Sequence, residues 1–123
     1  MKPLLIYLTL LIPVLGATQT WTAYAPFGDT MGVYSISLQN DNCAWFAGCR
    51  TDGHDLAKVA RTVDGGLSFN TAELPLQNPA YTACITSTDE STAYVIALQN
   101  WGNGVTLKTL DGGQTWQDRK SVV

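Results

Sequence analysis

Apolar and polar residues alternate along much of the chain, with the two-residue period of half-buried β-strands. The segment 33–39 alternates in this way, as in Ser35-Ile36-Ser37-Leu38, whereas the segment 43–49 is apolar almost throughout. A continuous apolar run predicts a strand buried on both faces. Asx- and Gly-rich turns separate two sets of four predicted strands, which are 33–39, 43–49, 57–63 and 67–74, then 81–87, 92–99, 104–110 and 114–118.

The two sets carry the same turn motif between their third and fourth strands. Both copies fit (S/T)-x-D-x-G-x-(S/T)-(W/F), and 47 residues separate Asp64 from Asp111. The motif residues are Thr62, Asp64, Gly66, Ser68 and Phe69 in the first copy and Thr109, Asp111, Gly113, Thr115 and Trp116 in the second. A four-stranded sheet repeated at this period predicts an all-β fold made of β-propeller blades.

The motif residues are suited to a stabilising turn. We expect each Asp to accept hydrogen bonds from backbone N–H groups two and three residues further on. The glycines permit positive φ angles, and the aromatic residue covers the turn with an apolar face. We therefore interpret Asp64 and Asp111 as structural residues and not as catalytic ones.

This pattern resembles the Asp-box, also called the bacterial neuraminidase repeat, over residues 21–117. It is most similar to secreted bacterial propellers with a type IX sorting domain and to photosystem II stability/assembly factor-like proteins. Lys or Arg precedes both motifs, at Arg61 and Lys108. The resemblance implies that the motif turns lie opposite the ligand face. It places the loops 26–32, 50–57, 75–80 and 99–104 on that face.

Two blades cannot close a ring, because four is the usual minimum for a propeller. The blades, 33–74 and 81–117, are therefore expected to be part of a fragment of a larger propeller, whose missing blades are partners of these two. The segment 20–25 resembles a fourth strand with no preceding strands, and it is expected to close the ring. The alternative is a two-blade unit that assembles with itself or with a partner.

The ends of the chain are expected to lie outside the propeller. Residues 1–17 have one positive charge, a short apolar run and small residues before polar ones, as in a secretory signal peptide. We therefore expect the protein to be exported to the cell surface, the extracellular space or the periplasm. We expect no stable membrane span after the signal peptide is cleaved. Residues 118–123 can be encoded by a string that resembles a sequencing adapter, and we interpret them as read-through.

Composition limits the function classes. Charged residues make up only 14% of the chain and the net charge is −3, which argues against nucleic-acid binding and against disorder. Cys43 and Cys49 are about 20 Å apart in an extended strand, too far for a disulfide. We expect buried free thiols, and a bridge from Cys84 to either cysteine stays open. No spacing suggests a metal site, and no cofactor is expected.

The candidate ligand-face residues are Arg50, Asp52, His54, Asp55 and Trp101. Asp52 and Asp55 are the only paired acids in that loop, His54 is the only histidine, and Trp101 is placed to stack on a sugar or a protein side chain. A sialidase would need a cluster of arginines, which this stretch does not supply. We predict a non-catalytic scaffold or binding module with a protein or glycan ligand. The alternative is a secreted glycoside hydrolase, sialidase or xyloglucanase-like, with its catalytic residues in other blades.

Overall fold

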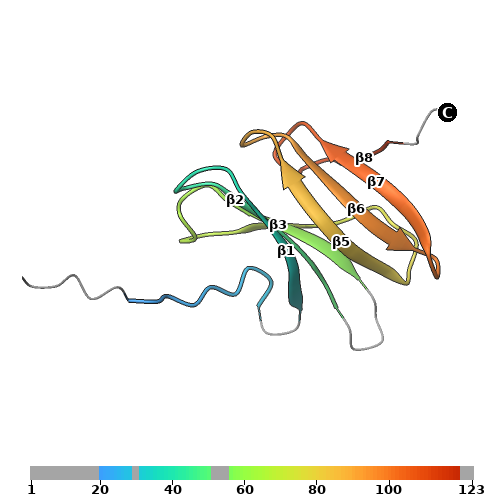
Figure 1. The fold of residues 1–123 in the computed structure, drawn as a ribbon, viewed down its shortest axis with the longest axis horizontal. Helices are drawn as coiled ribbons and strands as arrows, with labels where there is room; N and C mark the ends of the chain where they lie inside the picture. Colours follow the sequence, from blue (N-terminus) through green and yellow to red (C-terminus); the bar gives the residue numbers. More distant parts are fainter. Residues whose placement is uncertain (1–19, 29–30, 51–55, 120–123) are drawn as a thin grey trace, which may run out of the picture.

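The computed structural model describes residues 20–28, 31–50 and 56–119, and its regular elements are all β-strands (Figure 1). The first sheet contains β1 (Gly32–Leu38), β2 (Ala44–Cys49), β3 (Ala57–Thr62) and β4 (Asn70–Glu73). The second sheet contains β5 (Ala80–Ser87), β6 (Ala93–Gln99), β7 (Asn103–Thr109) and β8 (Gln117–Asp118).

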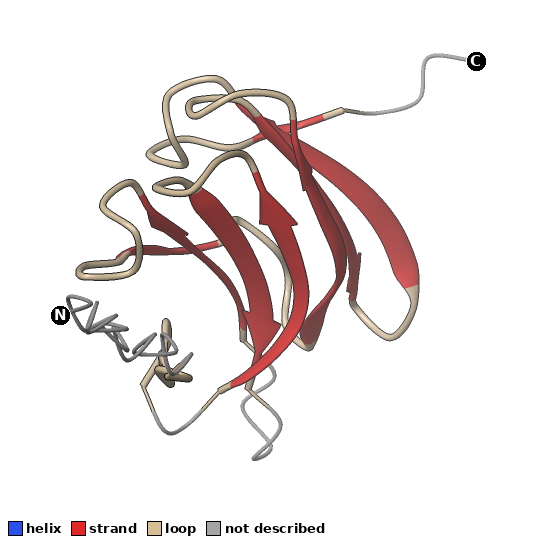
Figure 2. Cartoon of the chain, turned by 60° about the vertical axis from the view of Figure 1, so that its left-hand side comes forward, coloured by secondary structure: helices blue, strands red, loops and turns tan. Residues whose placement is uncertain are grey.

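Each sheet is an antiparallel meander in sequence order, β1-β2-β3-β4 and β5-β6-β7-β8. The two twisted sheets stack face to face, with β5 against β1 and β2 (Figures 1 and 2). Two four-stranded antiparallel sheets in this arrangement are two consecutive blades of a β-propeller, and the fold class predicted from the sequence is confirmed. We call β1–β4 the first blade and β5–β8 the second blade.

The fourth strand of each blade is shorter than its prediction. The sequence predicts a strand from residue 67, but residues 67–69 complete the turn before β4. Residues 114–116 do the same before β8. The backbone N–H of the residue just before the motif aromatic bonds to a carboxylate of the turn, so it is not available for strand pairing.

The core lies between the two blades. One face of β2, with Trp45, Ala47 and Cys49, packs against β5. The apolar face of β6, with Ala93, Val95 and Ala97, belongs to the same buried cluster. The prediction of a second strand buried on both faces is correct for β2, but β6 is buried on one face only. The first blade covers one side of β6, and no described element covers the other.

The described part of the N-terminal segment, residues 20–28, has no strand. Its Tyr24 ring packs edge-on to Phe69 of the first blade, at 6.3 Å between centroids. The predicted closing strand at 20–25 stays a prediction, because strand pairing there requires a partner blade. The predicted signal peptide, residues 1–17, lies outside the described residues. Within the described ranges, no helix is long and apolar enough to cross a membrane.

None of the three cysteines forms a disulfide, as expected, but only two of them are buried. Cys43, just before β2, and Cys49, its last residue, are buried, and burial raises the pKa of the Cys43 thiol. Cys84 is exposed on β5, which corrects the expectation of three buried thiols. Cys84 pairs with Ile96 on the face of the second sheet that is turned away from the first blade, and no described element covers that face. At the other end of the chain, Arg119 still donates its backbone N–H to the Thr106 carbonyl, 2.7 Å away.

Candidate functional site

The first motif turn, residues 62–69, is held together by the Asp64 carboxylate. Asp64 Oδ1 accepts hydrogen bonds from the Thr62 hydroxyl at 2.8 Å and from the Ser68 backbone N–H at 2.9 Å. Asp64 Oδ2 accepts a bond from the Ser68 hydroxyl. The Thr62 hydroxyl in turn accepts the Gly66 N–H at 2.8 Å. One carboxylate and one hydroxyl therefore bind both arms of the hairpin.

The second turn, residues 109–116, repeats this network. Asp111 accepts bonds from the Thr109 hydroxyl at 2.8 Å, from the Thr115 N–H at 2.9 Å and from the Thr115 hydroxyl at 2.6 Å. The Gly113 N–H donates to the Thr109 hydroxyl at 2.9 Å. Since the same contacts recur 47 residues later, the geometry follows from the motif and not from the neighbouring sequence.

The carboxylates bond mainly to a backbone group that the sequence does not predict. The sequence predicts bonds from N–H groups two and three residues after each Asp, but the N–H bonded at 2.9 Å lies four residues on in both turns. For Asp64, a weaker bond from the Leu67 backbone, three residues on, also lowers the pKa, as predicted. The earlier Gly66 and Gly113 amides are taken by threonine hydroxyls instead. Both glycines have positive φ, at 92° and 89°, which turns these N–H groups inward.

The hydrogen bonds stabilise the ionised carboxylates. The Ser68 hydroxyl and backbone N–H lower the pKa of Asp64 from 3.8 to about 2, and the Thr115 hydroxyl and N–H do the same for Asp111. A general acid or base at neutral pH needs a pKa near the working pH. These two carboxylates are instead strongly acidic and already bonded within their own turns.

A joint between the blades was not found by sequence reasoning. The Trp45 ring of β2 lies against the second turn, where a methyl group on Gly113 would stand 3.2 Å from it. Trp45 also packs edge-on to Trp116, with centroids 6.2 Å apart. The Arg61 guanidinium lies 5.4 Å from the Trp45 ring centroid and donates to the Glu90 carbonyl at 2.6 Å. The sequence contains one sign of this joint: an aromatic residue and a cation recur at matching positions of the two blades, as Trp45 with Arg61 and as Tyr94 with Lys108.

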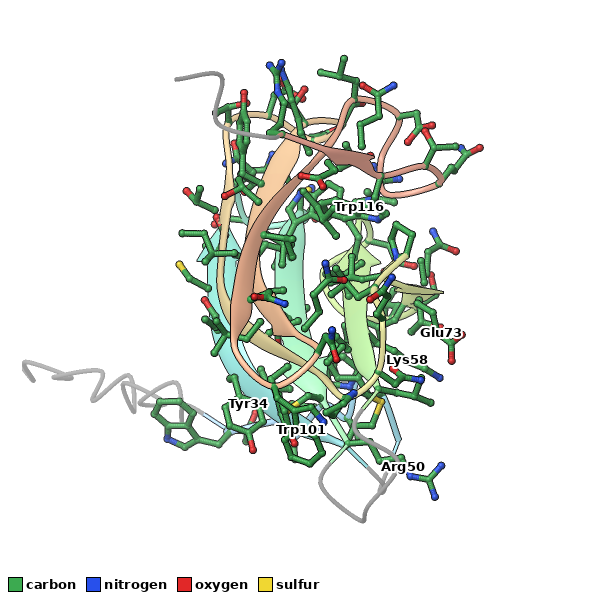
Figure 3. The ribbon with its side chains drawn as sticks, turned by 90° about the vertical axis from the view of Figure 1, so that its right-hand side faces the viewer. Tyr34, Arg50, Lys58, Glu73, Trp101 and Trp116 are labelled. Carbon is green, nitrogen blue, oxygen red and sulfur yellow. The ribbon has the colours of Figure 1, made fainter. Side chains whose placement is uncertain are left out.

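The opposite end of the blades carries two of the candidate ligand-face residues, Arg50 and Trp101. Figure 3 places Arg50 and Trp101 at one end of the molecule, together with Tyr34, and Trp116 toward the other end. Arg50 follows β2, and Trp101 lies in the turn between β6 and β7. Asp52, His54 and Asp55 fall outside the described residues, so the structure does not place them relative to Trp101.

Trp101 is presented by an unusual backbone conformation. Its side chain is 84% exposed, and its φ is 62°, next to Asn100 at 46°. A bulky residue with positive φ is a conformational outlier that costs about 1–3 kcal/mol. The Asn100 N–H donates to the Pro79 carbonyl at 3.0 Å, and this bond holds the turn against the segment between the blades.

The described ranges contain few other groups that could react or bind a ligand. They contain no group of three His, Cys, Asp or Glu side chains that could hold a metal ion. Half-buried Lys58 of β3 and exposed Glu73 of the edge strand β4 form an ion pair at 3.9 Å. Tyr34, at the same end as Trp101, has its pKa raised by a hydrogen bond with the Cys49 thiol. Among the described residues, the site is therefore one of exposed aromatics and a cation.

The blades define the class of protein, an all-β protein with β-propeller architecture. No family model matches the chain, and no curated protein matches it. Among solved structures, the chain is similar to the β-propeller described as "YCF48 bound to D1 peptide". The sequences are 24% identical, the TM-score is 0.52, and the match covers 72% of this chain. It spans only 26% of the other chain.

Proposed function

We propose that this chain belongs to an exported β-propeller that acts as a non-catalytic scaffold or binding module at the cell surface or outside the cell. Its two motif turns are Asp-boxes that stabilise the blades, and its ligand is a protein or a glycan bound at the end that carries Trp101. The different character of the two ends of the blades supports this assignment. Asp64 and Asp111 are engaged within their own turns, while an aromatic side chain stands free at the other end.

The observation that carries the proposal is the conformation of Trp101. A largely exposed tryptophan adds nothing to the core, yet the chain holds it at positive φ. Strained, exposed positions of this kind concentrate at binding sites, where the surrounding structure maintains them. Tryptophan is also the side chain most enriched among residues that dominate protein interfaces. Trp101 is therefore the proposed anchor for the ligand.

A peptide is the ligand that we test first. The structure to which the chain is similar was solved with a peptide bound, and the present chain offers an aromatic and the Arg50 cation at one end. Both groups suit an extended segment with aromatic or acidic side chains, through stacking and charge-assisted hydrogen bonds. A glycan would use the same tryptophan, stacked on a sugar ring.

The experiment is a binding screen of the purified chain against a peptide library and a glycan array, followed by titration of the best hit. We expect Trp101→Ala to weaken binding by at least about tenfold, as the loss of an aromatic anchor does. Leu110→Ala is the matched control. Leu110 is also an exposed apolar residue, but it lies in the second motif turn, at the other end of β7.

Equal affinity of both variants would refute the assignment of Trp101. Release of reducing sugar from a polysaccharide panel by the complete protein would refute the non-catalytic role. That result would favour the glycoside hydrolase alternative, with its catalytic residues in other blades.

A further inference from the structure

A cavity lies in the joint between the two blades, at the second motif turn. Its volume is about 490 Å³, which falls within the range of pockets that hold small ligands. Strands β3 and β4 form one wall and residues 112–114 of the turn form the other, so both walls belong to the described blades. Trp116, in that turn, and Trp101 lie toward opposite ends of the molecule (Figure 3), so the cavity is separate from the Trp101 end.

The side chains around the cavity form a polar row and an apolar row. Trp45, Arg61 and Asn70 are neighbours across β2, β3 and β4 by strand register, and the first two lie against the turn. Val59 and Ala72 form the next row on the same face, and both line the cavity. The cavity therefore has a polar end and an apolar end, and a matching ligand has a polar head on a small apolar body.

Two buried N–H donors in the polar row lack an acceptor in the part of the chain that the structure describes. They are Nε1 of Trp45, a side chain that is 0% exposed, and Nε of Arg61. Buried donors in native proteins nearly always have a partner, and an unpaired one calls for a bound molecule or another specific cause. The Trp116 indole in the same joint is already satisfied, since its N–H donates to the Gly113 carbonyl at 3.2 Å.

Charge narrows the choice of ligand. Arg61 is half-buried and lines the cavity, and its Nη1 donates to the Glu90 carbonyl at 2.6 Å, which is a neutral acceptor. The other edge of the guanidinium, with Nε and Nη2, has the spacing that matches the two oxygens of a carboxylate. Among the described residues that line the cavity, none is acidic. The cavity therefore has a positive charge and unpaired donors, and its lining supplies no anion.

We propose that this cavity binds a ligand with a carboxylate head and a small apolar body. The carboxylate accepts hydrogen bonds from Arg61 and from the Trp45 indole N–H, and the apolar body packs on Val59 and Ala72. A carboxylate fits better than a phosphate, because a single cation lines the cavity and the second charge of a phosphate would be buried unpaired. The carboxylate belongs either to a free small molecule or to an acidic side chain of a partner protein, and the test separates these two sources.

The test is an NMR titration of the purified, isotope-labelled chain with sodium benzoate and with a blocked tripeptide that has a central glutamate. Benzamide and the glutamine tripeptide are matched controls, because they have nearly the same shape without the charge. We expect the Trp45 indole N–H resonance to move with at least one carboxylate, and the Trp116 resonance to move less because its N–H is already bonded. Each neutral control should bind at least about tenfold more weakly than its carboxylate.

The comparison of the two carboxylates identifies the source of the ligand. Tighter binding of benzoate supports a free small molecule, and tighter binding of the glutamate tripeptide supports a partner protein. A Trp45 resonance that moves with neither carboxylate, or equally with the neutral controls, would overturn the proposal. Inorganic phosphate that binds as tightly as the better carboxylate would overturn it too, because the cavity would then not select a single negative charge.

Variants then test the two donors separately. Arg61→Lys keeps the positive charge but removes Nε, and Trp45→Phe keeps an aromatic ring but removes the N–H. Each should raise the dissociation constant of the better carboxylate at least about tenfold. Lys58→Gln is the control, because it removes a cation from the other face of β3, where Lys58 pairs with Glu73. Its dissociation constant should stay unchanged.

Far-UV circular dichroism shows whether each variant folds. A folded Arg61→Lys or Trp45→Phe variant with unchanged affinity would overturn the assignment of that donor and with it the proposed site. If a variant does not fold, the titration of the wild-type chain decides, since it needs no substitution. The Trp101 variant that tests the proposed function concerns the other end of the molecule, so either result can fail without the other.

Discussion

Thr109→Val tests whether the hydroxyl network of the second motif turn stabilises the protein. Valine has nearly the same shape as threonine, so the substitution removes the hydroxyl and leaves the packing in place. Thr109 is buried, and its hydroxyl is the acceptor for the Gly113 N–H at 2.9 Å. The valine variant therefore leaves a buried N–H without its acceptor.

The expected loss follows from these contacts. A buried donor left without an acceptor costs about 1–3 kcal/mol. The methyl group that replaces the hydroxyl returns at most about 0.8 kcal/mol through burial. We expect the free energy of unfolding to fall by about 1–2 kcal/mol, which lowers Tm by roughly 4–16 °C for a domain of this size.

Thr82 supplies a matched control. It is also a buried β-strand threonine, but its hydroxyl has no hydrogen-bond partner in the part of the chain that the structure describes. Thr82→Val removes a buried polar group that gains nothing from its surroundings, so we expect an increase in stability of about 1 kcal/mol. Urea unfolding followed by tryptophan fluorescence measures both variants, and an unchanged m-value shows that the unfolded states are comparable.

The two substitutions are therefore expected to have opposite signs. If Thr109→Val were neutral or stabilising, as Thr82→Val should be, the hydroxyl bond to Gly113 would not hold the turn. Thr109→Ser, which keeps the hydroxyl, should recover most of the loss. A serine variant as unstable as the valine variant would assign the effect to the methyl group instead.

Two further predictions concern the same turns. Because their folded pKa of about 2 lies below the unfolded value of 3.8, Asp64 and Asp111 stabilise the fold above about pH 4 and lose this effect as the pH falls toward 2. Thermal melts should show this decline, and a double Asp→Asn variant should flatten it. Gly113→Ala and Gly28→Ala both force alanine into positive φ, but only Gly113 faces Trp45. In urea unfolding, Gly113→Ala should lower the free energy of unfolding by about 1–3 kcal/mol more than Gly28→Ala does. Equal losses would argue against the contact between Gly113 and Trp45.

The strand assignments show how much of the fold the local sequence contains. Alternation, continuous apolar runs and Asx turns predicted all eight strands, because strand periodicity and turn chemistry act between near neighbours. The wrong starts of β4 and β8 come from hydrogen bonds within the motif turns. The error in the burial of β6 lies where a long-range contact decides. Ile96 and Leu98 belong to an apolar run like that of β2, yet they are exposed because no described blade covers them.

For the candidate sites too, some features could be predicted from the local sequence and others could not. The ten motif residues could be identified from spacing alone, but not which N–H each carboxylate accepts, because that depends on the φ of Gly66 and Gly113. From its loop, Trp101 could be named either as an exposed aromatic or as one packed against its own loop, and the structure shows that it is exposed. Its positive φ could not be predicted, since a tryptophan adopts that conformation only when other parts of the chain hold it there.

The sequence by itself determined the blade repeat, the position of each turn and the residues that stabilise it, since these depend on groups within a few residues of one another. Only the tertiary structure decided the joint between the blades. The joint brings together Trp45, Arg61 and Gly113, although 52 residues separate Arg61 from Gly113. The burial of each residue depends on the other blade being in place. The exposure of Ile36 and Ile96 follows from the same cause, because the burial of a side chain needs two facing surfaces and no single strand contains both.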